Sequence, residues 1–353
     1  MPRLRDLGIT IGDLPVGKYN AITDVPGVQV GHTTVIHDEP RIARTGVTII
    51  QPRDQPMWEN NCYAGYHSFN GNGEMTGLLW VEESGLLTSD VAITNTHQVG
   101  MVRDALIAHA VNQGAQNFWL LPVVAETYDG NLNDINAFHL NTNHVEDAIA
   151  SAAGGEVAEG NVGGGTGMLC HGFKGGIGTS SRLVNVEGEQ YTVGVLAQAN
   201  YGRRHLLRVD GVPVGKLIPL ERIPSPIHKP GGSIIVVVIT DAPLLPSQCR
   251  RLAQRATVGL ARVGGVGHNN SGDVFLALST GNTLRVGEIG VRAVNTVSHL
   301  SLSPFFDAVA EATEESILNA LTAAETMTGF QGRTAYALPL DELQTIMAKY
   351  PVV

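Results

Sequence analysis

The sequence predicts an α+β domain in which helices pack outside β-sheets. Short apolar runs of the strand type are mixed with helical periodicities, without the strict strand–helix alternation of a parallel α/β sheet. Hydrophobic residues make up 43% of the 353 residues and charged residues 16%, so a sizeable core can form. This length suits one large domain or two ordinary ones.

Six runs have the composition of β-strands. Each is rich in β-branched or aromatic residues and is bounded by glycine, proline, asparagine or aspartate. Several are apolar throughout, which predicts strands that are covered on both faces. The predicted strands are residues 46–50, 90–95, 117–124, 191–199, 233–240 and 273–280.

Five segments have helical periodicity. The first two end at glycines, Gly114 and the pair Gly154-Gly155, which is typical of helix C-termini. The fourth is rich in alanine and glutamate and stops before Gly329. The predicted helices are residues 99–112, 144–153, 247–262, 304–327 and 341–349.

Charge and cysteine content exclude several classes of protein. Acidic residues outnumber basic ones by 33 to 23, and no basic stripe is visible, so we expect no nucleic-acid partner. The three cysteines lack CxxC spacing, which argues against a disulfide framework or a structural zinc site and favours a reducing compartment. The N-terminus has no signal-peptide pattern, and the longest apolar run, 234–239, is too short to span a membrane. We therefore expect a cytoplasmic protein without a membrane partner.

The common nucleotide, metal and hydrolase motifs are missing. The glycine-rich segment 161–182 has no register with GxGxxG, and no GxxxxGK[ST] occurs, so a glycine-packed structural turn is the expected interpretation. Among twelve histidines there is no HExxH, and His139 and His144 lie five residues apart, off a shared helical face. GxSxG is also absent, which argues against an α/β-hydrolase.

A break in composition precedes the most apolar strand. Residues 221–232 hold three prolines, end in two glycines and run directly into the strand that begins at Ser233. One interpretation is a surface linker that enters a core strand. The other is a self-cleavage site, because a serine hydroxyl held close to the preceding glycine carbonyl can attack it and form an ester by an N-to-O acyl shift.

Hydrolysis of that ester would leave Ser233 with a free α-amino group. The unperturbed pKa of such a group is about 7.7–8.0. The amine can therefore accept the hydroxyl proton near neutral pH, so that nucleophile and base belong to one residue.

Several segments together resemble the DmpA-type aminopeptidases, the L-aminopeptidase/D-Ala-esterase and β-aminopeptidase family of N-terminal-serine hydrolases. The resemblance covers nearly the whole chain, in the expected order. It rests on Ile22-Thr-Asp-Val-Pro-Gly-Val-Gln-Val-Gly-His, Glu126-Thr-Tyr-Asp-Gly, Lys174-Gly-Gly-Ile-Gly-Thr-Ser-Ser-Arg, Ala199-Asn-Tyr-Gly-Arg-Arg, Ser233-Ile-Ile-Val-Val-Val-Ile-Thr-Asp-Ala-Pro-Leu-Leu-Pro and His268-Asn-Asn-Ser-Gly-Asp-Val-Phe-Leu-Ala-Leu-Ser-Thr-Gly-Asn.

The resemblance implies a four-layer αββα sandwich, like that of Ntn hydrolases but with different connectivity. It implies that the single domain 1–353 is cut between Gly232 and Ser233 into a large chain, 1–232, and a small chain, 233–353, which stay associated. It also implies a homotetramer of such pairs, no metal or organic cofactor, and substrates that are short peptides, amides or esters with a free amino group.

Residue roles follow from the same resemblance. Ser233 matches the family nucleophile. Ser271 and Asp273 match the positions that orient its hydroxyl and amine, and some relatives carry glutamate where Asp273 stands. The alternative for these two residues is a simple turn before a strand.

The other predicted site residues would bind the reacting carbonyl and the substrate amine. Asn200 matches an oxyanion-stabilising side chain, helped by the backbone N–H of Gly272, and Tyr128 a tyrosine near the carbonyl. Glu126 matches the carboxylate that holds the substrate ammonium. Taken singly, Asn200 could be a turn residue and Glu126 a solvated surface charge.

Two alternative functions remain open. One is an acyltransferase of the ornithine-acetyltransferase type, which passes the acyl group to an amine rather than to water, but that family uses threonine where Ser233 stands. The other is a non-catalytic binding protein that keeps the fold uncut.

Overall fold

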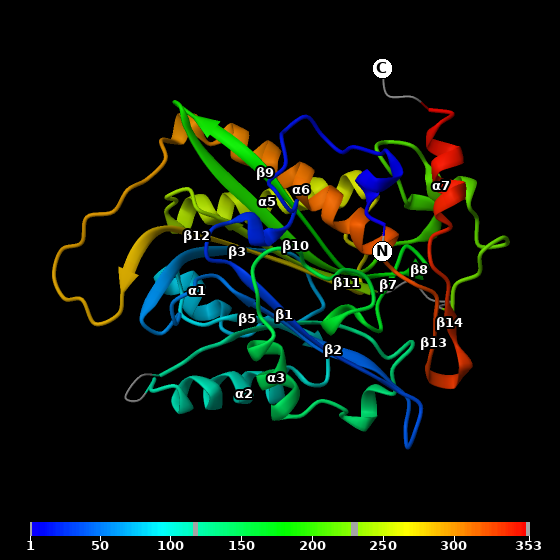
Figure 1. Ribbon diagram of the computed structural model, residues 1–353, viewed down its shortest axis with the longest axis horizontal. Helices are drawn as coiled ribbons and strands as arrows, with labels where there is room; N and C mark the ends of the chain where they lie inside the picture. The colour runs from blue at the N-terminus through cyan, green and yellow to red at the C-terminus, as the bar shows by residue number, and fades with distance from the viewer. Residues whose placement is uncertain (1, 116–118, 227–231, 351–353) are drawn as a thin grey trace.

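The computed structural model describes residues 2–115, 119–226 and 232–350, and two stacked sheets form its centre (Figure 1). The four-stranded sheet has the order β1-β2-β5-β6, and the six-stranded sheet has the order β4-β3-β12-β11-β10-β9. Helices α2 and α3 cover the outer face of the first sheet, and α5 and α6 cover that of the second. The predicted α+β class and the αββα sandwich are confirmed.

The strands and helices have the following bounds. The four-stranded sheet contains β1 (Gln29–His37), β2 (Ala43–Gln51), β5 (Val91–Asn95) and β6 (Val123–Thr127). The six-stranded sheet contains β3 (Asn60–Gly71), β4 (Leu86–Leu87), β9 (Gly176–Val186), β10 (Glu189–Asn200), β11 (Gly232–Thr240) and β12 (Ser271–Arg285). Two small hairpins are β7 (Leu169–Cys170) with β8 (Phe173–Lys174), and β13 (Met327–Thr328) with β14 (Thr334–Ala335). The helices are α1 (Leu78–Ser84), α2 (Val99–Asn112), α3 (Thr142–Ala150), α4 (Val214–Leu217), α5 (Pro246–Val263), α6 (Ser303–Thr322) and α7 (Leu340–Met347).

Strand β11 is buried on both faces, which explains its uninterrupted apolar sequence. Side chains alternate between the faces of a strand. Val236 and Val238 therefore pack with the α5–α6 layer, whereas Val237 and Ile239 pack between the two sheets. Neighbouring strands β10 and β12 complete its hydrogen bonding, so β11 is held on all four sides.

Some sequence predictions of element bounds are wrong. The strand predicted over 117–124 begins later and extends further, as β6 (Val123–Thr127). Residues 119–122 lie outside any strand, and Pro122 has no N–H to donate to a ladder. Residues 116–118 of that prediction lie outside the described residues. The helix predicted over 304–327 ends at Thr322, and Met327 already belongs to β13. The helix predicted over 144–153 runs instead from Thr142 to Ala150.

The glycine-rich segment 161–182, predicted to be a glycine-packed turn, contains a turn and several further elements. It forms the short 3₁₀ helix η4 (Gly163–Gly165), the β7–β8 hairpin and the start of β9. A Cβ on Gly178 would lie 2.0 Å from the carbonyl oxygen of Ser316 on α6, so only glycine allows the helix to approach β9 this closely.

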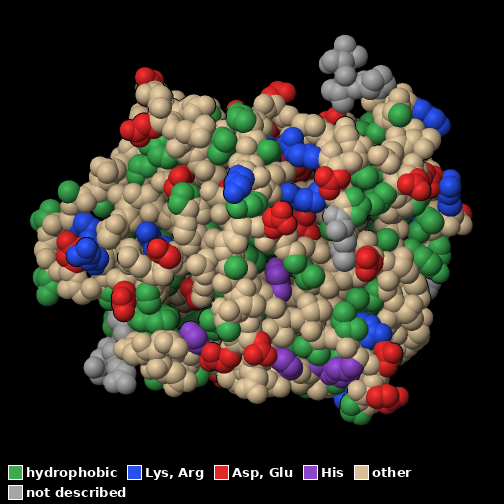
Figure 2. Space-filling view, in the orientation of Figure 1, with side chains coloured by type: hydrophobic (Ala, Val, Ile, Leu, Met, Phe, Trp, Pro, Cys, Tyr) green, Lys and Arg blue, Asp and Glu red, His purple; other side chains and the backbone are tan. Residues whose placement is uncertain are grey.

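Surface features agree with the charge pattern. On the face shown in Figure 2, acidic and basic side chains are interspersed rather than gathered in a basic stripe. Within the described ranges, no helix is long and apolar enough to cross a membrane. Residues 221–226 form the irregular connection that the prolines predict, but only half of them are exposed, and Ile223 packs against the core. Residues 227–231 lie outside the described residues.

Candidate active site

Ser233 lies at the start of the central strand of the six-stranded sheet. It is the second residue of β11, opposite Asn200 in the antiparallel pairing with β10 and opposite Gly272 in the parallel pairing with β12. Ser233 lies an even number of positions before Val237 and Ile239, so its side chain lies on the same face of β11 as theirs, the face between the two sheets. Ser233 is buried, with 5% of its surface exposed. A serine here is held in a defined place rather than on a free loop.

The residue before Ser233 has room only for glycine. A Cβ on Gly232 would lie 2.2 Å from the carbonyl oxygen of Asn200 and 2.8 Å from the Cα of Tyr201. Distances below 3.0 Å are too short for a real side-chain carbon. The junction glycine is therefore required by packing, and it leaves the carbonyl next to Ser233 uncrowded.

The side chain of Asn200 is held at both of its polar atoms. Its Oδ1 accepts the backbone N–H of Leu169 at 2.9 Å, and its Nδ2 donates to the backbone carbonyl of Tyr128 at 3.0 Å. These partners define which end of the amide is nitrogen. Because an amide nitrogen carries two hydrogens, one N–H is left to bind an oxygen atom near Ser233.

Ser271 and Asp273 form a buried pair beside the backbone of Ser233. Ser271 Oγ donates to Asp273 Oδ1 at 2.6 Å, and Ser271 pairs with Gly232 across the ladder. By strand alternation the two side chains share the face of Phe275, which packs toward α5 and α6, opposite to the face of Ser233 Oγ. They therefore flank the main chain at the Gly232–Ser233 bond, on the opposite side of the sheet from the Ser233 hydroxyl.

Burial changes the ionisation of Asp273. Loss of hydration raises the pKa of its carboxyl to about 6, while hydrogen bonds from Ser271 and from the backbone N–H of Ile234 lower it. A carboxylate with this pKa is ionised at neutral pH and protonated in mild acid.

Glu126 is buried near the C-terminal end of β6, which rules out the solvated surface charge considered from the sequence. Only 3% of it is exposed. Its Oε1 accepts the backbone N–H of Glu74 at 3.0 Å, and its Oε2 accepts the hydroxyl of Thr96. Burial raises the pKa of this carboxyl, and the two hydrogen bonds lower it. A fixed, partly desolvated carboxylate of this kind is suited to bind a cation.

A glycine connects Glu126 to the Ser233 region. A Cβ on Gly73 would lie 3.1 Å from the Cα of Gly272 and 3.2 Å from Glu126 Oε1. Since Gly272 is the ladder partner of Ser233, the structure brings Glu126 and Ser233 to one location although they are distant in sequence.

Tyr128 contributes its backbone as well as its ring. The carbonyl of Tyr128 holds Asn200, and 43% of the residue is exposed. Its ring folds over Gly130, where a Cβ would lie 2.3 Å from the phenol oxygen. The ring therefore lies at the open side of the site.

Three supporting groups were missed from the sequence: the Thr96 hydroxyl and the backbone N–H groups of Glu74 and Leu169. A signal existed for Thr96, because it directly follows β5, and β5 and β6 are parallel strands whose ends meet at one edge. The two backbone donors carry no residue-type signal.

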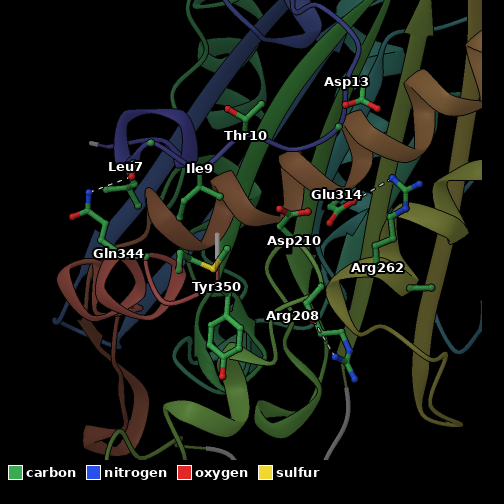
Figure 3. Close-up of a pocket in the computed structure, with 16 residues that line it drawn as sticks. Leu7, Ile9, Thr10, Asp13, Arg208, Asp210, Arg262, Glu314, Gln344 and Tyr350 are labelled. Carbon is green, nitrogen blue, oxygen red and sulfur yellow. Dashed lines mark hydrogen bonds and ion pairs between the residues drawn. The ribbon is translucent and has the colours of Figure 1, made fainter. Parts of the chain in front are cut away.

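The prominent cavity in Figure 3 is elsewhere. It has a volume of about 1020 Å³ and lies between the N-terminal segment, the end of α5, the middle of α6 and α7. Its lining includes Asp210, Arg262 and Glu314, and it includes none of the predicted site residues. In the described parts of the chain, no group of three or more histidine, cysteine, aspartate or glutamate residues is placed to hold a metal ion.

Comparison with known proteins identifies the family. The model of peptidase family S58 matches residues 20–335. The chain belongs to peptidase family S58. The beta-peptidyl aminopeptidase BapA of Sphingosinicella microcystinivorans is 47% identical, over 99% of this chain and 92% of that protein, and its counterpart in Sphingosinicella xenopeptidilytica is 42% identical, with the same coverage.

Solved structures agree with this membership. A beta-aminopeptidase of Burkholderia sp. superposes with a TM-score of 0.94 at 50% identity, covering all of both chains. The L-aminopeptidase D-Ala-esterase/amidase of Ochrobactrum anthropi, a variant of the Ntn hydrolase fold, superposes with a TM-score of 0.92 at 43% identity, covering 99% of both chains. The S58 chain is thus an aminopeptidase of the N-terminal-serine type, a hydrolase of peptide bonds. These findings favour it over the acyltransferase and the non-catalytic alternative.

Proposed function

We propose that Ser233 is the nucleophile, and that it becomes the first residue of the small chain when the Gly232–Ser233 bond is hydrolysed. The observation that carries this proposal is the position of Ser233, buried at the start of a central strand between Asn200 and Gly272. The proposed products are residues 1–232 and 233–353, which remain associated because β11 lies between β10 and β12.

The freed amine is the proposed general base. It would lie where the chain now continues to Gly232, on the side of Ser271. The Ser271–Asp273 pair would orient this amine, and the amine in turn would take the proton of the Ser233 hydroxyl as it attacks. The leaving amine then departs and water hydrolyses the acyl-enzyme.

The negative charge of the tetrahedral intermediate needs hydrogen-bond donors. We assign this role to the remaining N–H of Asn200 and to the backbone N–H of Gly272, with Tyr128 beside the reacting carbonyl. The two-point attachment of Asn200 supports the assignment, because a donor that is already oriented requires no rearrangement during the reaction.

Glu126 would read the free amino terminus of the substrate. Its buried carboxylate would pair with the substrate ammonium, so the substrates are short peptides, amides or esters with an unblocked N-terminal residue. The names of the similar proteins extend this class to β-aminoacyl and D-aminoacyl groups. We also propose a cytoplasmic homotetramer of the processed pairs; the three free, buried cysteines support a reducing compartment.

The dependence of activity on a free substrate amine tests the proposed function. Glu126→Gln keeps the size of the side chain and removes its charge, so the KM for amino-acid p-nitroanilides should rise about 10- to 100-fold, with a smaller change in kcat. Steady-state kinetics with free and N-acetylated substrates measure this. The matched control is Glu83→Gln, which removes the charge of an exposed carboxylate on α1. Equal rates on free and acetylated substrates would contradict the proposal.

Asp273 carries a prediction about pH. Its carboxylate accepts the Ser271 hydroxyl fully only above its pKa of about 6, so kcat/KM should fall as the pH drops below that value. A positive charge on the Ser233 amine would shift this limb to lower pH. Asp273→Asn should lower kcat/KM about 100-fold at pH 8 and remove the contribution of Asp273 to the acid limb, so that only protonation of the Ser233 amine still lowers the rate in acid. A pH–rate profile of both proteins measures this.

The stability of the Asp273 variant should change in the opposite direction. A raised pKa means that the carboxyl favours folding below its ordinary value of 3.8, and that this contribution is lost as the pH rises through 6. Asp273→Asn should therefore have a higher Tm than the native protein at pH 8. If stability and activity fell together, Asp273 would be a structural residue only.

A further inference from the structure

Lys174 is a buried lysine from a family-like segment to which the proposed mechanism gives no role. It lies on β8 with 0% of its surface exposed, and its Nζ donates to the carbonyl of Gly175 at 2.7 Å and to that of Gly165 at 3.3 Å. Over the described residues, it forms no ion pair with a carboxylate within 4.0 Å. A buried cation without a counter-charge is unfavourable, so its presence calls for a specific reason.

The two hydrogen bonds persist whatever the charge of Lys174. Burial lowers the pKa of its amino group to about 7. An ammonium has three N–H donors and a neutral amine has two, and two are enough for the carbonyls of Gly165 and Gly175. Lys174 can therefore hold these carbonyls together without carrying a fixed charge in the interior.

One of these carbonyls belongs to a residue that packs on the end of β10. A Cβ on Gly175 would lie 2.4 Å from the carbonyl oxygen of Ala199, so backbone meets backbone there. Leu169, the direct partner of Lys174 in the β7–β8 hairpin, donates its N–H to Asn200 Oδ1. The hairpin that carries Lys174 thus contacts two consecutive residues at the end of β10.

The other carbonyl belongs to a turn that packs one residue earlier on the same strand. Gly165 ends the η4 turn, and a Cβ on its neighbour Gly164 would lie 2.2 Å from Gln198 Oε1. Lys174 therefore links the η4 turn to the hairpin, and together they enclose residues 198–200.

We propose that Lys174 is a positioning residue for the amide of Asn200. By binding both carbonyls it holds the Leu169 N–H at the distance that orients the Asn200 side chain toward the Ser233 region. This role rests on the proposed function of Asn200 as the oxyanion donor. Lys174 itself touches neither substrate nor nucleophile.

The test uses Lys174→Met and Lys174→Gln in the full chain. Methionine removes both hydrogen bonds, whereas glutamine keeps a donor group, so kcat should fall in the order native, Gln, Met, with the Met variant about 10- to 100-fold below native. KM should change less than about twofold, and the pH at which kcat inflects should not move. Rates are expressed per mole of released small chain. If the Met variant fails to fold, the Gln variant decides.

The matched control is Cys170→Ala. Cys170 is fully buried in the same hairpin and precedes the turn that leads to Lys174. Its Cβ, which packs on Gly175, is kept in alanine, and its thiol forms no hydrogen bond with Gly165, Gly175 or Asn200. Its loss should lower the Tm without changing kcat more than about twofold.

A double-mutant cycle with Asn200→Ala separates positioning from general structure. If Lys174 acts through Asn200, Lys174→Met should lower kcat less than about threefold when Asn200 is already alanine. A full additional loss in that background, or a native kcat for Lys174→Met, would overturn the inference and leave the role of Asn200 intact. A native kcat for Asn200→Ala alone would instead refute the oxyanion assignment.

Discussion

Ser233→Ala is expected to leave a single polypeptide of 37.4 kDa and to lower peptide hydrolysis by at least about 10⁴-fold. The variant lacks the hydroxyl that attacks the Gly232 carbonyl during processing, and the same hydroxyl that attacks the substrate afterwards. Alanine fits the strand at a position where only 5% of the serine is exposed, so folding should be preserved. A denaturing gel and p-nitroanilide turnover measure the two effects.

The control for this variant is an exposed serine. Ser247 lies on the first turn of α5, away from β11. Ser247→Ala should process and hydrolyse like the native chain. Turnover of p-nitroanilides by Ser233→Ala at a rate near that of the native protein would place the nucleophile elsewhere.

Asn200→Ala is expected to lower kcat about 10²- to 10³-fold, which corresponds to about 2.7–4 kcal/mol of transition-state stabilisation. One pre-oriented N–H is lost from the site where negative charge develops. KM should change little, because the ground-state carbonyl is a weaker acceptor than the oxyanion. The variant also leaves the Leu169 N–H and the Tyr128 carbonyl unpaired, so its Tm should fall.

Gln198 offers a matched control for that experiment. It is an amide two residues earlier on the same face of β10, and it bonds to the Thr94 carbonyl and the Thr127 hydroxyl rather than near Ser233. Gln198→Ala should lower the Tm and leave kcat within a few-fold of native. Equal losses of kcat in the two variants would show that β10 needs both amides for packing only.

Much of the fold was predictable because pattern and packing agree. Strand β11 is apolar throughout and buried on both faces, and α2 has the predicted bounds 99–112. Strands β3 and β9 escaped prediction because they are rich in polar residues and glycine. On β9 the small residues are needed for contact with α6, and strand propensity does not include such tertiary contacts.

The candidate site divides in the same way. Its residue types were available from the sequence because they occur in family-like segments such as Asn-Ser-Gly-Asp and Glu-Thr-Tyr-Asp-Gly. The environment of Glu126 could not be read from the sequence, since its hydrogen bonds come from Thr96 and from the backbone of Glu74, which lies in the connection between β3 and α1. Likewise, nothing local in the sequence reveals that a main-chain N–H and a main-chain carbonyl from two distant segments orient Asn200.

The intact mass and N-terminal sequence of the purified native protein test the central claim most directly. We expect two polypeptides of roughly 25 and 13 kDa, scaled by chain length from 37.4 kDa, and a small chain whose N-terminus reads SIIVVV. A lone uncut chain of 353 residues that cleaves peptides at the full rate would contradict it.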